Sequence, residues 1–320
     1  MSLRTNGSTL WVFLLGAHSG QVEQRFVFDV AFGILALETA GVDSDNIRVL
    51  IDNSGKITVD DVFSRTGLDR YTIIETSDLS DVLREDSRYS DIVMFVTGHG
   101  NHEYIVAEKP IKPVKLINDI KSVGNIRRAV LYLGQCYAGI FNYLSVGRTR
   151  DEINTDDGCE IIVIGASNLS PSISISTTED FGVEKIPWHA NIFLLGLFVW
   201  IRNPIDIDGD GKCTIMDSYK FAGSYANQFL AKRDEIVFAN SLADLIRFKV
   251  SIEEIDKQIH AQGINNIILP GGRKLTAIEL MAARAAITQK MQIANNEVVM
   301  CMNHQESWIL NARPAQEIEF

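Results

Sequence analysis

One histidine and one cysteine each follow an apolar run of strand length, a position from which a side chain can take part in catalysis. His99 follows the apolar run Asp91–Thr97 and lies between two glycines, and Cys136 follows the apolar run Ala129–Gly134 after Gln135. A thiol becomes an efficient nucleophile when a nearby imidazole draws it toward the thiolate, and the same imidazole can later protonate a leaving amine. The two residues therefore predict a Cys–His dyad that cleaves an acyl bond through a thioacyl-enzyme.

The glycines beside His99 favour the same chemistry. Gly98 and Gly100 allow the backbone to come close to a substrate, because neither carries a Cβ atom. The backbone N–H groups of Gly100 and Cys136 are expected to bind the oxyanion that forms during acyl transfer. Alone, a cysteine after a strand is usually a small buried hydrophobe and a histidine in a turn is usually structural. The combination at the ends of consecutive strands favours a catalytic role.

Five short apolar runs must position these residues. They alternate with helical patterns over about the first 235 residues, which indicates a largely parallel sheet covered by helices. In such sheets, reactive groups gather beyond the carboxyl ends of the strands. The predicted strands are Leu10–Gly16, Ile47–Ile51, Asp91–Thr97, Ala129–Gly134 and Glu160–Gly165. Helices are expected at Arg25–Ala40, Ser77–Glu85, Val114–Val123 and Trp188–Trp200, with loops that include Gly147–Gly158 and Asn168–Asp180.

The order of these motifs resembles the clan of cysteine peptidases that contains caspases, legumains, gingipains, separases and the catalytic subunit of the glycosylphosphatidylinositol transamidase. The segments Gly98–Asn101 and Gly134–Gly139 carry the resemblance, which extends over about residues 9 to 222. It implies a caspase-like three-layer αβα fold with a mostly parallel central sheet, Cys136 as nucleophile and His99 as acid/base. The N-terminal positions that match a legumain-type pattern are Arg25, Asp29, Ala31, Leu35, Gly41, Asp45, Ile47 and Val49.

The sequence departs from the family at several points. Legumains have Asp where this chain has Gly98, and Glu where it has Tyr137. Caspases place the histidine about 50 residues before the cysteine, whereas the spacing between His99 and Cys136 is 37 residues. These differences leave the dyad in place and bear on the pH profile and the substrate.

The resemblance also implies a substrate pocket around Arg25. In legumains and caspases a basic residue near the start of the first helix contacts the substrate side chain before the scissile bond. A guanidinium there favours Asp, Glu or Asn through paired hydrogen bonds. The alternative is a surface arginine paired with Glu23 or Asp29. The other expected substrate contacts are Gln135, Ser172 and Ser174, and His18 and Ser19 are further candidates for the border of the cleft.

An acidic loop predicts a calcium site. The segment Asp206–Asp217 matches the EF-hand pattern D-x-D-x-D-G, with an acidic residue at position 12. Oxygen ligands at this spacing can surround one Ca²⁺, which either stabilises or regulates the domain. The alternative is an Asp-rich turn that caps the next helix without metal. The expected ligands are Asp206, Asp208, Asp210, the backbone carbonyl of Lys212, and Asp217.

Composition limits the class of protein. The chain has 320 residues, 46% hydrophobic and 22% charged, with a formal charge of −11. This charge argues against nucleic acid or an anionic membrane as partner, because both require clustered Lys and Arg. The expected partner is a peptide or protein substrate, and a homodimer is left open. Four widely spaced cysteines and no apolar run long enough for a membrane span favour a cytoplasmic protein.

The sequence divides into two predicted parts. Residues 1–235 are expected to form the peptidase domain, with the EF-hand-like loop at 206–217, and residues 236–320 a mainly helical C-terminal extension. In the extension, helices are expected at Asp234–Gln262 and Thr276–Asn295, and strands at Glu297–Met302 and Ser307–Leu310.

Three alternatives stay open for function. The first is a non-catalytic binding or scaffold protein with a caspase fold, although both dyad residues are present. The second is a metal enzyme that uses His99, His102 and Cys136, a loose ligand set for a loop. The third is an amidase or transpeptidase that uses the same acyl-enzyme.

Overall fold

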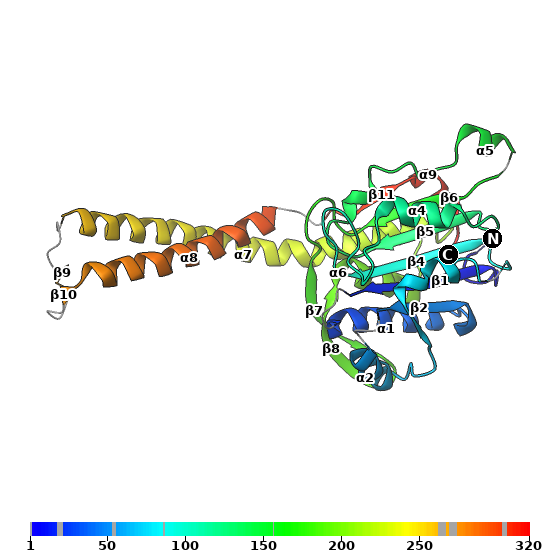
Figure 1. The fold of residues 1–320 in the computed structure, drawn as a ribbon, viewed down its shortest axis with the longest axis horizontal. Helices are drawn as coiled ribbons and strands as arrows, with labels where there is room; N and C mark the ends of the chain where they lie inside the picture. Colours follow the sequence, from blue (N-terminus) through cyan, green and yellow to red (C-terminus); the bar gives the residue numbers. More distant parts are fainter. Residues whose placement is uncertain are drawn as a thin grey trace. The chain divides into compact units, whose positions relative to one another are not determined.

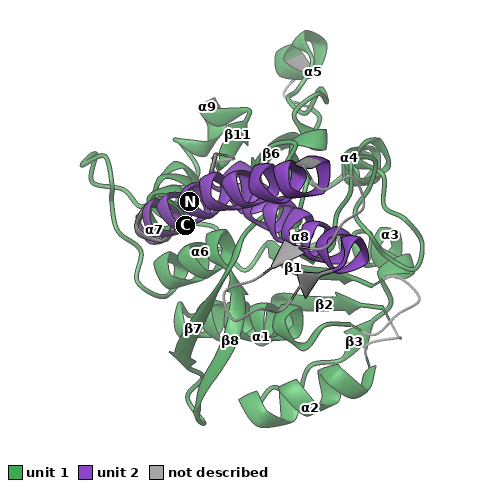
Figure 2. Cartoon of the chain, turned by 90° about the vertical axis from the view of Figure 1, so that its left-hand side faces the viewer, with its two compact units in different colours: residues 1–227, 305–320 green, residues 228–304 purple. Residues whose placement is uncertain are grey.

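The computed structural model describes residues 2–17, 22–52, 56–85, 87–155, 157–261, 267–268, 274–302 and 306–320. It divides into two compact units, residues 1–227 with 305–320, and residues 228–304 (Figure 2). Among the described residues, no helix combines the length and the apolar character needed to cross a bilayer.

The first unit is built on a mostly parallel sheet (Figure 1). Among the described residues this sheet has seven strands in the order β11-β6-β5-β4-β1-β2-β3, of which β11 alone runs antiparallel, to β6. The five predicted strands are confirmed as β1, β2, β4, β5 and β6, and β3 is an additional short strand at one edge. The bounds are β1 Thr9–Gly16, β2 Ile47–Ile51, β3 Ile73–Ile74, β4 Asp91–Gly98, β5 Arg128–Leu133, β6 Glu160–Gly165 and β11 Trp308–Leu310.

Helices cover both faces of this sheet, so the unit has three layers, helix–sheet–helix. Alternate residues of β1 point into two separate hydrophobic clusters, as the two-residue period of a strand requires. Trp11 and Phe13 lie in a cluster with residues of α1 and α6, whereas Val12 and Leu14 lie in a cluster with residues of α3 and α4. The bounds of the helices in this unit are α1 Gln24–Thr39, α2 Lys56–Thr66, α3 Leu79–Val82, α4 Pro113–Lys121, α5 Arg150–Thr155, α6 Ile192–Arg202 and α9 Ala312–Ala315.

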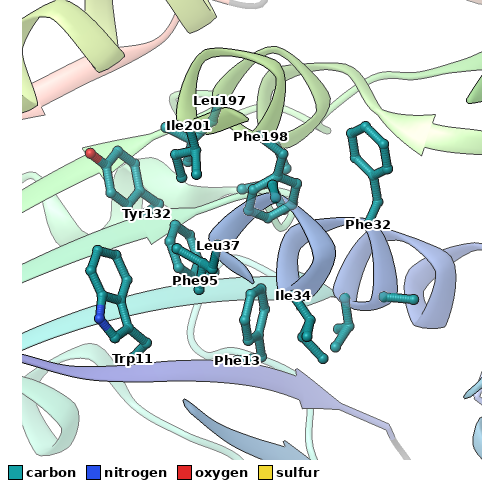
Figure 3. Close-up of a cluster of buried hydrophobic side chains, with 14 of the residues drawn as sticks. Trp11, Phe13, Phe32, Ile34, Leu37, Phe95, Tyr132, Leu197, Phe198 and Ile201 are labelled. Atoms are coloured by element: carbon teal, nitrogen blue, oxygen red, sulfur yellow. The ribbon is translucent and has the colours of Figure 1, made fainter. Parts of the chain in front are cut away.

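Aromatic side chains fill the centre of the first of these clusters (Figure 3). The ring of Phe95 stacks on those of Phe13 and Tyr132, at centroid distances of 5.0 and 5.5 Å. Helix α1 approaches this cluster at Gly33, where a Cβ atom would lie 2.5 Å from the Phe13 ring and 2.6 Å from the Phe198 ring. A side chain at position 33 would therefore push α1 away from α6 and the sheet.

The strand register brings the predicted reactive loops to one edge. In β1 and β4, Gly16 pairs with Gly98, and in β4 and β5, Val96 pairs with Leu133. The carboxyl ends of β1, β4 and β5 are therefore level, and the segments that follow β4 and β5 leave the sheet side by side.

The region between β6 and α6 differs from the sequence prediction. A loop was expected at 168–180 and a helix from Trp188, but the chain forms an antiparallel hairpin of β7 (Ser174–Asp180) and β8 (Lys185–Asn191). Helix α6 begins only at Ile192, because the side chain of Asn191 accepts a hydrogen bond from the Leu194 N–H (3.0 Å) and caps the helix.

The C-terminal part holds two further corrections. Helix α7 (Ile215–Ala261) is continuous, and α8 spans Ala277–Met302, so the predicted strand at 297–302 is wrong. The short pair β9 (Ile267–Ile268) and β10 (Lys274–Leu275) lies between these helices in the chain.

The last residues of the chain belong to the first unit, whereas the predicted boundary at 235/236 assigned them to an extension. The predicted strand at 307–310 is confirmed as β11, and it pairs with β6. The indole of Trp308 covers Gly165, where a Cβ would lie 2.3 Å from the ring, and its Nε1 donates to the Ser167 carbonyl at 2.7 Å. This packing explains why the segment is part of the sheet.

Candidate active site

The loops that carry the predicted dyad are in contact at the carboxyl edge of the sheet. A Cβ atom on Gly100 would lie 2.3 Å from the Cys136 carbonyl oxygen and 2.6 Å from the side chain of Gln135. Gly98 has φ of +100°, which residues with a side chain rarely adopt. Gly100 is therefore needed for the close approach of the two loops and Gly98 for the turn, whereas the sequence analysis assigned these glycines to the approach of a substrate.

Cys136 is half-buried and lies against the segment after β6. Its Sγ accepts a hydrogen bond from the Ser172 N–H (3.3 Å), and the Ser172 hydroxyl lies 3.7 Å from the same sulfur. The next residue, Tyr137, has a left-handed backbone with φ of 57°, and its N–H donates to the Ser170 carbonyl. A non-glycine residue in this conformation stores backbone strain, which is frequent at functional sites.

His99 is held by a residue that the sequence prediction did not assign to catalysis. Its Nε2 lies 2.7 Å from Oε1 of Glu23, and its ring meets the Phe26 ring edge-on at a centroid distance of 5.0 Å. The imidazole side chain is still 51% exposed. Because Nε2 faces a carboxylate, it carries a proton, and in the neutral ring Nδ1 is then the free acceptor.

Arg25 shares the same carboxylate. Its Nε donates to Oε2 of Glu23 at 2.6 Å, and its Nη1 donates to the Ser174 hydroxyl at 3.0 Å. The guanidinium also stacks on the Phe26 ring at 4.0 Å. The hydrogen bond from Arg25, and to a smaller extent that from His99, holds the pKa of Glu23 below its usual value, so Glu23 is ionised.

This geometry contains elements of both interpretations of Arg25. The ion pair with Glu23 is the surface alternative, whereas the contact with Ser174 joins Arg25 to the segment of the predicted pocket. Glu23 immediately precedes α1, two residues before Arg25. In the sequence, the only indication that Glu23 belongs to the site is its acidic side chain close to Arg25, the predicted pocket residue.

A buried carboxyl group lies beneath Arg25. Asp29 is 3% exposed and accepts hydrogen bonds from Trp188 Nε1 (3.0 Å), the Asn191 N–H (3.2 Å) and Thr97 Oγ1 (3.2 Å). Burial raises its pKa to about 7, against the opposing effect of these donors. Asp29 thus connects α1 to the end of β4 and to β8. These hydrogen bonds fix the first turns of α1, which also carry Arg25.

Gln135 is an exception to the usual pairing of buried polar groups. Its side chain is buried, and neither its Nε2 nor its Oε1 has a hydrogen-bond partner among the described residues. Buried polar groups are nearly always paired, and an unpaired one in a site is commonly completed by water or by a ligand. Asn191 is close by, since its Nδ2 donates to the Gly134 carbonyl at 2.6 Å.

Two further predictions concern residues around this edge. His18 and Ser19 lie outside the described residues. His102 is exposed, and among the described residues no group of three potential metal ligands includes it, His99 or Cys136. The geometry therefore lends no support to the metal-enzyme alternative.

The acidic loop brings three of the predicted calcium ligands together. Oxygens of Asp206, Asp208 and Asp210 lie within 4.8 Å of one another, a spacing that a hard cation with oxygen ligands can span. The loop turns at Gly209 and Gly211, both with positive φ, and the Gly211 N–H donates to Asp206 at 2.8 Å. Three carboxylates at this spacing fit a Ca²⁺ ion.

Asp217 and Lys212 have other contacts. Both oxygens of Asp217 accept hydrogen bonds, Oδ1 from the Ile207 N–H (2.9 Å) and Oδ2 from the N–H and hydroxyl of Thr214 (2.8 and 2.7 Å). The Thr214 hydroxyl in turn accepts from the Asp217 N–H, which makes a capping box at the start of α7. The Lys212 N–H donates to Asp210 at 2.9 Å. The helix-capping alternative thus describes Asp217 well, while the other three aspartates form the cluster.

No protein-family model matches the chain, and no curated protein is significantly similar to it.

Proposed function

We propose that this protein is a cysteine peptidase of the caspase-like type. The single observation that carries the proposal is the contact between the two loops that hold His99 and Cys136, at the carboxyl edge of a parallel sheet. The three-layer αβα arrangement supports it, since the resemblance to the caspase–legumain clan implies the same layers and the same loops.

The chemistry follows from the hydrogen bonds around the dyad. Glu23 holds His99 through Nε2, which leaves Nδ1 to take the proton of the Cys136 thiol. The thiolate attacks the substrate carbonyl carbon, the C–N bond breaks, and the protonated imidazole gives its proton to the leaving amine. Water, activated by the same imidazole, then attacks the thioacyl carbon and releases the acid and the free thiol. The backbone N–H groups of Gly100 and Cys136 donate hydrogen bonds to the oxyanion that forms on the substrate carbonyl.

The proposed substrate is a peptide or protein with Asp, Asn or Glu before the scissile bond. The guanidinium of Arg25 stacks on the Phe26 ring and donates to Ser174. It therefore borders the start of β7, close in sequence to Ser172, which contacts Cys136. The half-buried hydroxyl of Ser172, beside Cys136, offers a further donor and acceptor for a peptide backbone, whereas the unpaired amide of Gln135 is buried.

Calcium and location belong to the same proposal. Asp206, Asp208 and Asp210 would hold one Ca²⁺, which would fix the loop that leads into α7. Cys136, Cys159 and Cys213 are free thiols, which is compatible with a cytoplasmic protein in a reducing compartment.

The test combines a peptide library with thiol mapping. We expect turnover of peptides with Asp, Asn or Glu before the cleaved bond, lost in Cys136→Ala and His99→Ala, and unchanged in the matched control Cys213→Ala. Iodoacetamide should modify Cys136 fastest, as located by mass spectrometry of the digested protein. Full activity in a folded Cys136→Ala variant would refute the proposal, and products joined to an added amine would indicate transpeptidation through the same intermediate.

A further inference from the structure

A cavity with several arginines lies at the opposite edge of the sheet from the candidate active site. It has a volume of about 720 Å³, within the range of about 300–1,000 Å³ that is usual for small-molecule sites. The residues that line it include the first residues of three neighbouring strands, Asp91 of β4, Arg128 of β5 and Glu160 of β6. Parallel strands begin at the same edge, so these residues are far along the strands from His99 and Cys136.

Four guanidinium groups line this one cavity. Arg127 immediately precedes β5, Arg128 is its first residue, Arg148 lies in the segment before α5, and Arg313 lies in α9. In a protein of net charge −11, this concentration of positive charge departs from the average surface. Among the described residues, the carboxylates of Asp91, Glu160 and Glu317 also line the cavity, so the arginines that line it outnumber the carboxylates within this part of the chain.

Two of the three carboxylates already have their hydrogen bonds. Asp91 is buried and accepts from Arg128 Nε at 2.5 Å and from the Ser90 hydroxyl at 2.9 Å. Glu160 accepts from Arg148 Nε at 3.2 Å and from Asn311 Nδ2 at 2.5 Å. These ion pairs orient Arg128 and Arg148, and each of these two bonds to a carboxylate uses the Nε of the arginine.

The terminal groups of two arginines are available for a ligand. The bond from Arg128 to Asp91 uses Nε, and among the described residues its two Nη groups have no hydrogen-bond partner. The exposed side chain of Arg313 likewise makes no hydrogen bond or ion pair within the described part of the chain. A planar guanidinium with a free Nη edge binds two oxygens of one phosphate or pyrophosphate group.

We infer that this cavity binds a small molecule that carries a phosphate or pyrophosphate group, of about nucleotide size. The ion pairs with Asp91 and Glu160 hold Arg128 and Arg148 in place before the ligand arrives, which reduces the entropy lost on binding. The inference does not depend on the proposed peptidase activity, because the cavity and the dyad are at opposite ends of the strands.

The experiment uses the whole chain with inorganic phosphate, pyrophosphate, AMP and ATP as probes. Calorimetry and thermal unfolding are measured for the wild type, for the double variant Arg127→Ala/Arg313→Ala, and for Arg247→Ala as a matched control outside the cavity. Arg128 is left intact, since its removal would leave the buried Asp91 without its cation.

We expect one site per chain for pyrophosphate or ATP, a raised thermal midpoint, and at least a 10-fold weaker affinity in the double variant with no change in the control. Tighter binding of ATP than of pyrophosphate would identify a nucleotide, and equal binding would identify the phosphate groups alone as the ligand. No binding of any of the four probes to the folded wild type at millimolar concentration would overturn the inference, as would equal affinity in the double variant.

Discussion

Replacement of Asp29 by asparagine should make the protein more stable at neutral pH. Asp29 is buried beneath Arg25 and accepts hydrogen bonds from Trp188, Asn191 and Thr97. An asparagine can keep this arrangement, because its carbonyl oxygen can accept from Trp188 and Asn191 while its NH₂ group donates to the Thr97 hydroxyl. The substitution therefore removes the charge and leaves the contacts.

The size of the effect follows from the pKa of Asp29. Burial raises this pKa from 3.8 to about 7, and each unit of difference between the folded and unfolded chain corresponds to about 1.4 kcal/mol. Between these two values the unfolded chain has lost the proton and the folded chain has kept it. The contribution of Asp29 to the free energy of unfolding thus falls as pH rises from about 4 to 7, by about 4 kcal/mol in total, and is constant above that.

The assay is urea unfolding of the wild type and of Asp29→Asn at several pH values from 4 to 8.5, followed by tryptophan fluorescence. All four tryptophans belong to the first unit, so the signal reports on the unit that contains Asp29. The difference in free energy of unfolding should be near zero at pH 4 and should rise to as much as about 4 kcal/mol in favour of the variant above pH 7. Asp60→Asn, at an exposed position of α2, is the matched control and should give a flat difference.

Two results would refute this reasoning. One is a difference between wild type and Asp29→Asn that does not change with pH. The other is a variant less stable than the wild type at pH 8, which would mean that the hydrogen bonds to the carboxylate outweigh the free-energy cost of its burial.

Three further predictions concern the site and the acidic loop. Glu23→Ala should lower kcat/KM because nothing then holds Nε2 of His99, and Glu23→Gln should restore most of it because the amide oxygen can still accept from Nε2; full activity in Glu23→Ala would exclude Glu23 as a positioning residue. Arg25→Lys should reduce kcat/KM about 10- to 100-fold on peptides with an acidic residue before the cleaved bond, because a point charge replaces a two-pronged donor; an equal loss on peptides with alanine there would indicate a structural role instead. Lys220→Met should tighten calcium binding in calorimetry, since the ammonium lies 2.7 Å from Asp208 and competes with the ion; unaltered affinity would argue against Asp208 as a ligand.

The sheet could be predicted from the sequence because its strands are buried on both faces. Near-continuous apolar runs such as Asp91–Gly98 are long enough to be recognised without knowledge of their neighbours. The β7–β8 hairpin was missed because β7 is rich in Ser and Thr, which resembles a loop, and its pairing is visible only in the fold. The segment with Val298 and Val299 looked like a strand, but Ala294, Val298 and Cys301 are the buried residues around it, and they recur at the helical spacing of four and three on α8. The packing of α8 within the second unit therefore favours a helix over a strand for this segment.

For the candidate site, the sequence identified the residues that lie directly at strand ends. His99 and Cys136 are fixed by local order, since each follows a strand and neighbouring strands end at the same edge. Glu23 could not be identified in this way, because it reaches His99 across 76 residues of sequence from a position before α1. The helix-capping role of Asp217 likewise depends on atoms of the turn that only the folded loop brings together.

The position of β11 determines when this protein can finish folding during synthesis. Residues 228–304 separate β11 from the rest of the first unit in the chain, and β11 pairs with β6, next to the strand that leads to Cys136. Beyond it, the Phe320 ring meets the Trp11 ring of β1, and the Leu3 N–H donates to the Glu319 carbonyl at 2.9 Å. These contacts join segments more than 300 residues apart, and β11 lies just before them in the chain, so the sheet stays without this edge strand until residues 308–310 have left the ribosome. A nascent chain therefore keeps an unpaired β6 edge throughout translation of the intervening helices, until residues 308–310 have been made and can pair with β6.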